Sequence, residues 1–360
     1  MEKSAKIYVA GHRGLVGSAI KRNLEQRGYT NVIGRTHSEL DLLDAAAVRR
    51  FFDEEQPEYV VLAAAHVGGI MANSRYRADF IWRNLGIQQN VIGESFRHGV
   101  RKLLFLGSTC IYPREAAQPI KESSLLTSPL EYTNEPYAIA KIAGLKMCES
   151  FNLQYGTNYI AVMPTNLYGP NDNFNLETSH VLPAMIRKTC LAHLLTEGNW
   201  DALRADLACR PVEGVDGKAS QRDIEAILAK YGIRHGQLTL WGTGAPLREF
   251  LWSEDMADAS VHIMEHIDFD DVRGSEPDVR NCHINIGTGK ELTIRELAAL
   301  IKRTVGFCGD ILWDSAKPDG TMRKLCDVSK LHSLGWWHKV EIDEGVGRLY
   351  DWYRASVKER

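Results

Sequence analysis

The sequence has no apolar run of the ~18 residues that a membrane-spanning helix needs, so no membrane association is expected. Its seven cysteines are dispersed and include no Cys-x-x-Cys pair, which predicts neither a disulfide framework nor a metal site. The formal net charge of -3 gives no electrostatic reason to expect nucleic acid as a partner. The first residues, MEKSAKIYVAG, also lack the apolar stretch of a signal peptide. Together these absences predict a cytoplasmic protein with reduced thiols.

What the first half of the sequence does contain is a regular alternation of strands and helices. The apolar runs KIYVAG, YVVLAAA and KLLFLGS predict buried strands, and the stretches between them have helical periodicity. This alternation is typical of a parallel sheet covered by helices on both faces. The predicted fold is therefore α/β, with a Rossmann-type doubly wound parallel sheet over residues 1–170, to which residues 236–262 return. Residues 171–360 are expected to form mainly a smaller C-terminal α/β lobe.

Three glycines in the spacing G-x-x-G-x-x-G directly follow the first predicted strand. Glycine at these positions allows a sharp turn and lets a pyrophosphate approach a helix N-terminus. The context of strand, turn and helix favours a dinucleotide site over a merely structural turn. The predicted cofactor-binding residues of this loop are Gly11, His12, Arg13, Gly14, Leu15, Val16 and Gly17.

The end of the second predicted strand distinguishes the two nicotinamide dinucleotides. A protein that binds NAD places an acidic residue there for the ribose 2′-hydroxyl, but this chain has Gly34 and Arg35 in NVIGRTHSEL. A guanidinium suits a 2′-phosphate, and Arg13 could add a second positive charge. The sequence therefore predicts NADP(H). The alternative is that Arg35 is only solvated and that Glu39 or Asp41 binds the ribose.

Tyr137 and Lys141 in YAIAK lie about one turn apart on the same face of a predicted helix. The ammonium is expected to favour the phenolate and to reach the nicotinamide ribose. The tyrosine can then give a proton to a carbonyl oxygen as hydride reaches the carbon. Ser108 ends an earlier predicted strand. The order of glycine loop, Ser108, Tyr137 and Lys141 predicts a reductase in which these three side chains are catalytic.

Longer blocks of sequence extend these motifs over nearly the whole chain. The motif set resembles the extended short-chain dehydrogenase/reductase superfamily. More specifically, the chain resembles the GDP-L-fucose synthase family in the blocks VAGHRGLVGSAI, LAAAHVGGI, LGSTCIYP, NEPYAIAKIAGLKMCES, MPTNLYGPNDNF, SHVLPAMIRK, WGTGAPLREFL and KPDGTMRKLCDVSKL. The resemblance implies an NADPH-dependent enzyme that epimerises C3 and C5 of GDP-4-keto-6-deoxy-D-mannose and reduces C4, giving GDP-L-fucose. It also implies a substrate-binding role for the second lobe and a homodimer.

The resemblance further implies roles for single residues. Cys110 and His180 match the acid/base pair that moves the C3 and C5 protons through an enolate, where a neighbouring imidazolium would lower the thiol pKa. The alternative for Cys110 is a small buried hydrophobe. Ser108 and Tyr137 would hold the C4 oxygen. The implied cofactor-site residues beyond the glycine loop and Arg35 are Leu106, Gly107, Tyr137, Lys141, Pro164, Thr165, Asn166, Leu167 and His180. The implied substrate-binding residues are Lys188, Trp241, Arg248 and Asp319, although Trp241 could instead be a packed core residue.

The stretch from Thr196 to His235 departs from the family pattern. It is polar, and its pieces GNWDALRADLA and SQRDIEAILAKYG are predicted to be helical. Its length of about forty residues is too great for a simple loop, so a helical insertion over 196–235 is expected. Two interpretations stay open: a cap over the sugar site, or a peripheral helical hairpin. In either case the fold is expected to survive deletion of the segment.

Alternative functions also stay open at this point. The same epimerase and reductase chemistry could act on a related GDP-4-ketosugar such as a heptose, or the enzyme could reduce C4 only. A non-catalytic NADP-sensing protein on the same fold is the remaining alternative. The presence of Tyr137, Lys141, Cys110 and His180 together argues against it.

Overall fold

The computed structural model describes residues 1–275, 277–317 and 319–358. Backbone contacts divide the chain into two compact units. Unit 1 contains Met1–Leu167, Glu249–Lys290 and Leu325–Lys339, and unit 2 contains Tyr168–Arg248, Glu291–Lys324 and Val340–Arg360. The segments that return to the first unit are therefore 249–290 and 325–339, whereas the sequence suggested 236–262.

A parallel sheet of six strands forms the centre of unit 1 in the order β11-β5-β4-β3-β1-β2. Its strands are β1 (Ile7–Ala10), β2 (Val32–Ile33), β3 (Tyr59–Leu62), β4 (Lys102–Leu106), β5 (Tyr159–Pro164) and β11 (Ile284–Ile286). The winding reverses between β1 and β3, and in such sheets ligands bind at the carboxyl ends of the strands at the reversal. The arrangement confirms the predicted doubly wound sheet.

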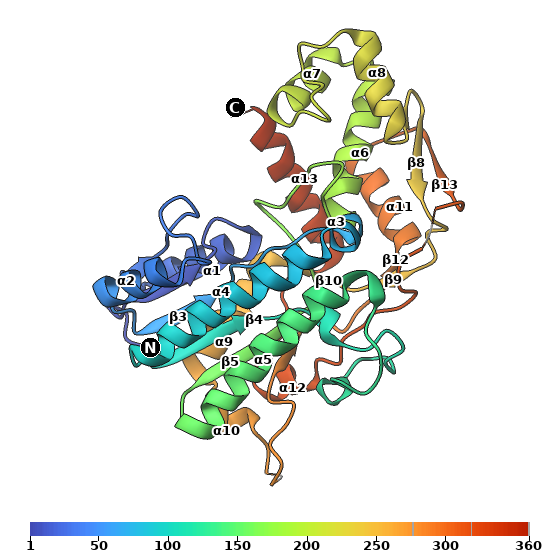
Figure 1. Ribbon diagram of the computed structural model, residues 1–360. Coiled ribbons are helices and arrows are strands. Elements are labelled where there is room, and N and C mark those ends of the chain that lie inside the picture. The colour runs from blue at the N-terminus through green and yellow to red at the C-terminus, as the bar shows by residue number, and fades with distance from the viewer. Residues whose placement is uncertain (276, 318, 359–360) are drawn as a thin grey trace. The chain divides into compact units, whose positions relative to one another are not determined.

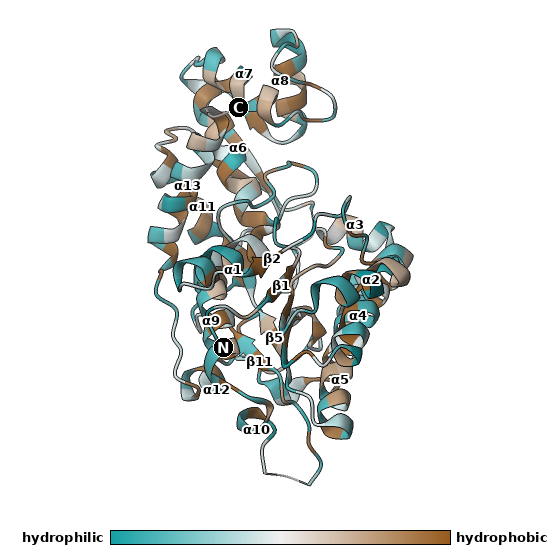
Figure 2. Ribbon diagram, turned by 90° about the vertical axis from the view of Figure 1, so that its left-hand side faces the viewer, coloured by the Kyte–Doolittle hydropathy of each residue, from teal (hydrophilic) through white to brown (hydrophobic). Residues whose placement is uncertain are grey.

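Helices cover both faces of this sheet (Figures 1 and 2). One face packs against α1 (Leu15–Gln26) and α9 (Ser253–His266), and the other against α2 (Ala45–Glu55), α4 (Arg77–Arg97) and α5 (Glu135–Tyr155). Successive side chains of β1 alternate between the two cores, as the pleat requires: Ile7 and Val9 pack on the α1 side, Tyr8 and Ala10 on the α2 side. Because both faces are buried, the strands are continuous apolar runs in the sequence.

Smaller elements complete unit 1. They are α3 (Ile70–Arg75), the 3-10 helices η1 (Thr109–Ile111), η2 (Glu122–Ser124) and η3 (Tyr132–Asn134), the paired strands β6 (Asn166–Tyr168) and β10 (Phe250–Trp252), and the helices α10 (Phe269–Val272) and α12 (Ser329–Ser333). The last residue of β6, Tyr168, is counted with unit 2.

Local sequence explains where the main helices begin and end. Asp44 caps α2 by accepting hydrogen bonds from the backbone N–H groups of Ala46 and Ala47, both at 2.9 Å. Helix α5 has Pro136 in its first turn and stops at Gly156, whose φ of 69° suits glycine. Helix α9 begins at Ser253, which is fully buried, and Trp252 occupies the cap position.

Unit 2 contains a three-stranded sheet, a strand pair and five helices among its described residues. The sheet has the order β13-β8-β7, with β7 (Ile233–Arg234), β8 (Gln237–Trp241) and β13 (Asp310–Asp314). β9 (Leu247–Arg248) pairs antiparallel with β12 (Leu292–Thr293). The helices are α6 (Val181–Thr196), α7 (Trp200–Cys209), α8 (Gln221–Lys230), α11 (Ile294–Val305) and α13 (Ile342–Lys358).

The segment 196–235 is helical as expected, but it is not peripheral. Asp206 of α7 is 2% exposed and accepts a hydrogen bond from Arg187 Nε of α6 at 2.9 Å and one from the hydroxyl of Tyr353 of α13. Leu203 and Leu207 of α7 are fully buried. The expectation that the segment could be deleted without loss of the fold is therefore corrected, because deletion would leave the Arg187 charge buried without its carboxylate.

Within the described part of the chain, none of the helices combines the length and the apolar character that crossing a bilayer would take.

Candidate active site

The glycine loop joins the end of β1 to the start of α1. Gly11 has a φ of 85°, and a Cβ there would come within 2.8 Å of the backbone of Ala64, just beyond β3. A Cβ on Gly17, in the first turn of α1, would come within 2.2 Å of the Gly11 carbonyl oxygen. These two close approaches, together with the positive φ, explain why both positions need glycine. Leu15 and Val16 begin the helix beside them.

The N-terminus of α1 is open to an anion. Gly14 is its N-cap and supplies no side-chain hydrogen bond, and the first turn carries no acidic residue. His12 lies in the loop with a buried Nδ1 that has no hydrogen-bond partner among the described residues. Burial, with Lys21 and Arg13 nearby, lowers the pKa of this imidazole, so it is neutral at pH 7. Free N–H groups and an unpartnered buried nitrogen are what a pyrophosphate site requires.

Arg35 follows β2 and is already paired within unit 1. Its guanidinium forms an ion pair with Glu55 of α2, donates to the Gly34 carbonyl at 3.0 Å and lies over the Phe51 ring. No motif or spacing in the sequence predicts this ion pair. Arg13, by contrast, is exposed and has no hydrogen bond or ion pair within the described ranges.

The acidic alternatives to Arg35 have their own arrangement. Glu39 accepts hydrogen bonds from the N–H and the hydroxyl of Thr36, both at 2.7 Å, and these bonds lower its pKa. Glu39 therefore stabilises the turn formed by residues 36–39. Asp41 accepts from the backbone N–H of Leu43 at 2.9 Å and also serves a local turn. Neither carboxylate occupies the position directly after β2, where Arg35 lies.

Ser108 and Cys110 lie just beyond the carboxyl end of β4, after Leu106 and Gly107. The Ser108 hydroxyl accepts a hydrogen bond from the backbone N–H of Cys110 at 3.3 Å and so caps the short helix η1. Cys110 is 7% exposed. Its thiol is close enough to Tyr137 and Lys141 to act on both electrostatically. The three predicted catalytic side chains and Cys110 are thus brought together in unit 1.

Lys141 is the most constrained member of this group. It is 3% exposed, and its Nζ donates to the Leu106 carbonyl at 2.7 Å and lies 5.8 Å from the centroid of the Tyr137 ring. Burial lowers the pKa of the ammonium to about 8, while a thiolate on Cys110 would raise it. Lys141 is therefore fixed by a backbone carbonyl, with its charge near the titration midpoint in mildly alkaline solution.

The environment of Tyr137 differs from the expected phenolate. Burial raises the pKa of Tyr137, and the nearby Cys110 raises it further. Phe80 packs edge-on against the ring, with centroids 6.2 Å apart. The free enzyme therefore holds a protonated phenol, which is the form that can donate a proton.

The cofactor-side residues after β5 are held by Glu249. Pro164 ends β5, Thr165 follows, and Asn166 and Leu167 begin β6. The Asn166 amide donates to the Glu249 carbonyl at 2.8 Å. The buried carboxylate of Glu249 accepts hydrogen bonds from the backbone N–H groups of Thr288 at 2.6 Å, Gly289 at 2.8 Å and Cys326 at 3.0 Å. Sequence reasoning missed Glu249, although it directly follows Arg248 in the block WGTGAPLREFL.

His180 and Lys188 belong to α6 in unit 2. His180 is the N-cap residue, and burial lowers the pKa of its imidazole, which therefore stays neutral at pH 7. Cys110 belongs to unit 1 and His180 to unit 2. Lys188 lies two helical turns further along, with its Nζ near two aromatic rings.

Trp241, Arg248 and Asp319 surround the turn that follows β8. Trp241 is 60% exposed, so it is not a packed core residue. Asp319 accepts hydrogen bonds from the N–H of Thr243 at 2.9 Å and from its hydroxyl at 2.7 Å, and these bonds lower its pKa. Arg248, in β9, donates to the Leu247 carbonyl at 2.7 Å. Burial lowers its pKa, and Asp319 opposes this effect. Asp319 therefore shapes the turn, while Arg248 has unused donors.

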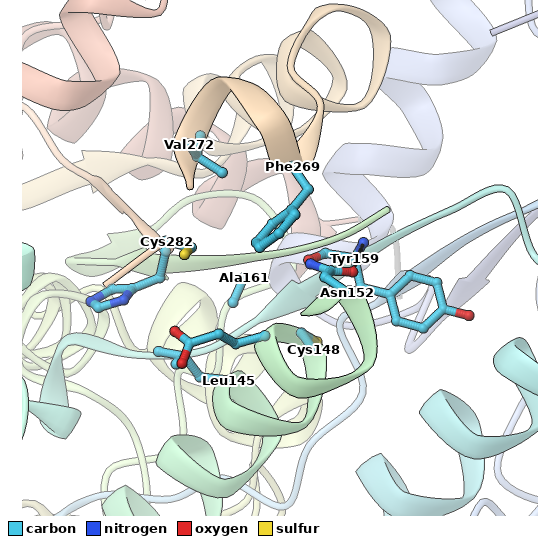
Figure 3. Close-up of a pocket in the computed structure, with 10 residues that line it drawn as sticks. Leu145, Cys148, Asn152, Tyr159, Ala161, Phe269, Val272 and Cys282 are labelled. Carbon is cyan, nitrogen blue, oxygen red and sulfur yellow. Dashed lines mark hydrogen bonds between the residues drawn. The ribbon is translucent and has the colours of Figure 1, made fainter. Parts of the chain in front are cut away.

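A small cavity in unit 1 lies outside this group of residues (Figure 3). It lies between α5, β5 and the segment 269–283, and contains Cys148, Cys282 and His283. Burial raises the pKa of both thiols, to about 11 for Cys282, and lowers that of His283 to about 3. Protonated thiols are poor nucleophiles. No group of three potential ligands with metal-site geometry occurs among the described residues.

Comparisons with known proteins extend over the full chain. The model of the NAD dependent epimerase/dehydratase family matches residues 7–205 and 209–287. GDP-L-fucose synthase 1 of Arabidopsis thaliana is 52% identical over 359 residues, which cover 100% of this chain and 96% of that protein.

Two solved structures from Campylobacter jejuni are also similar. A GDP-6-OMe-4-keto-L-xylo-heptose reductase has a TM-score of 0.93 at 44% identity and covers 99% of both chains. A GDP-D-glycero-L-gluco-heptose synthase, solved in the presence of NADPH, has a TM-score of 0.91 at 44% identity and covers 98% of this chain and 99% of its own. The glycine loop after β1, the Tyr137–Lys141 helix and these full-length matches agree: the chain belongs to the NAD dependent epimerase/dehydratase family and, within it, to the family of the GDP-L-fucose synthases.

Proposed function

We propose that this protein is an NADPH-dependent enzyme that epimerises C3 and C5 of GDP-4-keto-6-deoxy-D-mannose and reduces C4 to give GDP-L-fucose. The observation that carries the proposal is the 52% identity with a GDP-L-fucose synthase over the whole chain. It is supported by the grouping of Ser108, Cys110, Tyr137 and Lys141 in one unit. Unit 1 is the proposed NADP-binding domain, and unit 2 is the proposed substrate-binding lobe.

The residues of unit 1 suit NADP(H). The uncapped N-terminus of α1, the glycine contacts that exclude side chains and the unpartnered His12 Nδ1 suit a pyrophosphate. Arg13 and Arg35 would bind the 2′-phosphate, with Arg35 exchanging Glu55 for the ligand. Leu106, Gly107 and residues 164–167 would border the nicotinamide half. NADPH, when bound, supplies the hydride for C4.

The reduction needs a proton as well as a hydride. Tyr137 holds a proton in the free enzyme and can give it to the C4 oxygen. Lys141, fixed on the Leu106 carbonyl, can then stabilise the phenolate that remains. The Ser108 hydroxyl can donate to the same oxygen, which holds the carbonyl in position before and during the reaction.

Epimerisation needs a base on one face of the sugar and an acid on the other. Loss of a proton from C3 or C5 gives an enolate, because both carbons flank the C4 ketone. We assign these proton transfers to Cys110 and His180 on the strength of their match to the family blocks. His180 is neutral in the free protein and can accept a proton. Ser108 and Tyr137 would stabilise the enolate oxygen.

The GDP moiety requires cationic and aromatic groups, which unit 2 supplies. Arg248 has free donors for the diphosphate, and Lys188 adds a second positive charge. The exposed indole of Trp241 offers a face for stacking. Asp319 would contribute indirectly, by stabilising the turn that contains Thr243 and follows Trp241.

A heptose substrate is the second candidate. It is favoured by the TM-score of 0.93 with the heptose reductase from Campylobacter jejuni, although that protein is less identical than the fucose synthase. The two candidates differ in the group at C6 of the sugar. Product analysis by NMR, with each GDP-4-ketosugar in turn, separates them.

The proposed assembly is a homodimer that works in the cytoplasm. Helices α4 and α5 pack against each other and carry large exposed apolar side chains: Trp82 at 75%, Leu153 at 49% and Tyr155 at 52%. Exposed apolar groups concentrated on one helix pair mark an interaction surface. Sedimentation of the intact protein tests the dimer, and substitution of Trp82 by Glu should shift it to a monomer.

The function is tested with NADPH and GDP-4-keto-6-deoxy-D-mannose in D₂O. We expect NADPH oxidation together with deuterium at C3 and C5 of the product. Cys110→Ser should slow the exchange sharply, because a hydroxyl is a far poorer base than a thiol near neutral pH. If NADPH is oxidised but no deuterium appears at C3 and C5, the protein is a 4-reductase without epimerase activity. Absence of turnover with any GDP-4-ketosugar would favour the NADP sensor.

A further inference from the structure

Lys188 is a half-buried lysine without an anionic partner. No hydrogen bond or ion pair joins its Nζ to any residue that the structure describes. The ammonium instead lies over two rings, 5.9 Å from the centroid of Tyr231 and 6.0 Å from the centroid of Trp241. Burial lowers its pKa to about 8. A desolvated cation held only by ring faces is arranged for an anion that the chain itself does not provide.

Tyr231 comes from the segment 196–235 and directly follows α8. Its hydroxyl donates to Glu213 Oε1 at 2.7 Å. Lys230 holds the same carboxylate at 2.6 Å and 2.5 Å. Glu213 lies in a turn closed by the paired backbones of Val212 and Val215. These contacts inside the segment, together with Glu177 outside it, fix the orientation of the Tyr231 ring.

The segment also has a fixed position against α6. Asp206 of α7 binds Arg187, the residue directly before Lys188, through two nitrogens at 2.8 and 2.9 Å. Arg187 also donates to the Phe174 carbonyl at 3.1 Å. Because this pair is buried, the relation between the segment and the α6 turn that carries Lys188 is constrained.

We propose that Tyr231 is a positioning residue for nucleotide recognition, and that with Trp241 it holds the Lys188 ammonium in place for the diphosphate of the GDP-sugar. The inference rests on the proposed function for the identity of the ligand. Ring faces attract the ammonium without neutralising it, so the positive charge stays available to the phosphate oxygens. The segment 196–235 is then part of the nucleotide site.

A double-mutant cycle measured by calorimetry on the full chain tests the proposal. Tyr231→Leu should weaken GDP binding about three- to thirty-fold and leave guanosine, which has no phosphate, unchanged. In the Lys188→Met background, Tyr231→Leu should have no further effect on GDP, because the group through which it acts is gone. Tyr231→Phe keeps the ring and should retain most of the affinity. Trp200→Leu removes a ring of the same segment that faces Arg204 instead, and serves as the matched control.

Each outcome is decisive. Additive losses in the cycle, or equal losses for GDP and guanosine, would show that Tyr231 only supports the fold and would overturn the inference. If Tyr231→Leu does not fold, the cycle is repeated with Tyr231→Met and with Glu213→Gln, which frees the ring from its anchor, and additivity in the cycle of the folded variant again overturns it. Should the wild-type protein bind no GDP, the proposed substrate class fails and the inference fails with it. If the wild-type protein binds GDP but the cycle is additive, the inference fails while the proposed function stands.

Discussion

The two units hold their candidate binding groups in opposite ways. In unit 1 the groups are already bound to the protein: Lys141 to the Leu106 carbonyl, Asn166 to the Glu249 carbonyl and Arg35 to Glu55. In unit 2, Lys188 lies near two ring faces and has no anionic partner among the described residues. Lys141 and Asn166 are thus in place before a ligand arrives, whereas Lys188 has a positive charge that its ligand must complete.

The two lysines differ in when the cost of ordering the side chain is met: during folding for Lys141, and on ligand binding for Lys188. A lysine fixed by a backbone carbonyl loses its side-chain freedom when the protein folds, so its position costs nothing further during catalysis. A lysine without an anionic partner keeps its electrostatic attraction for the moment of binding. We therefore expect substitutions of Tyr137 or Arg35 in unit 1 to change kcat or cofactor preference, and substitution of Lys188 in unit 2 to change KM for the nucleotide sugar.

The largest expected effect is a loss of kcat for reduction, caused by a substitution in unit 1. Tyr137→Phe removes the proton donor and should lower kcat for reduction by about 10²–10⁴-fold. NADPH affinity should stay unchanged, because Lys141 keeps its bond to Leu106. Stopped-flow measurement of NADPH oxidation at saturating sugar gives the rate, and exchange at C3 and C5 in D₂O should persist. A variant that loses NADPH binding instead would assign Tyr137 to the cofactor site.

Two neighbouring substitutions in unit 2 test whether a charge with an ion-pair partner and a charge without one have different roles. Arg187 is fully buried and paired with Asp206, while the next residue, Lys188, has no ion pair with any residue that the structure describes. Arg187→Met should cost about 3–5 kcal/mol of unfolding free energy, because it leaves Asp206 buried and unpaired. Lys188→Met should cost far less in stability and should raise KM. Urea unfolding measures the free energy of unfolding of both variants. Equal destabilisation would contradict the idea that Arg187 serves stability and Lys188 serves binding.

Cofactor preference is expected to respond more moderately. Arg35→Ala should raise KM for NADPH relative to NADH by the equivalent of about 1.5–3 kcal/mol, the contribution of a hydrogen bond to a charged group. Glu55→Gln should lower KM for NADPH, because Arg35 no longer has to leave an anionic partner. Steady-state kinetics with both cofactors provides the measurement. Equal effects of Arg35→Ala on NADPH and NADH would disprove the assignment of Arg35 to the 2′-phosphate.

The smallest expected effect is a pH dependence that separates the two lysines. Lys141 and Lys188 both have pKa values lowered to about 8 by burial, so both are charged below pH 8 and neutral above it. Loss of the Lys188 charge should raise KM for the nucleotide sugar by at most about tenfold per pH unit above that point. Lys188→Met should abolish the pH dependence of KM and leave that of kcat. Lys317→Met, which removes an exposed lysine facing Trp241, is the control.

The sequence allowed the chemistry of unit 1 to be predicted because that chemistry depends on local spacing. Gly11, Gly14 and Gly17 follow a strand, and Tyr137 and Lys141 are four positions apart on one helix. Each of these patterns fixes its own geometry. The protonated state of Tyr137 was not predictable, because it depends on burial and on Cys110, which lies far from it in the sequence.

Long-range partners explain the remaining differences. Glu55 is 20 residues from Arg35, Asp206 is 19 residues from Arg187, and Tyr353 is 147 residues from Asp206. No periodicity connects such positions, so the polar composition of 196–235 suggested a detachable hairpin. The sixth strand, β11, was also not predicted, because a run of three residues in CHINIG is too short to give a strand pattern.

The place of β11 in the central sheet has a consequence for the synthesis of the chain. β5 ends at Pro164, and its neighbour β11 begins only at Ile284. A ribosome adding about 5–20 residues per second needs roughly 6–24 s to make the roughly 120 residues between them. During that interval the edge of β5 has no partner strand, and open edges pair readily with other chains. The nascent protein must therefore be protected along β5 until the second half of the chain has emerged.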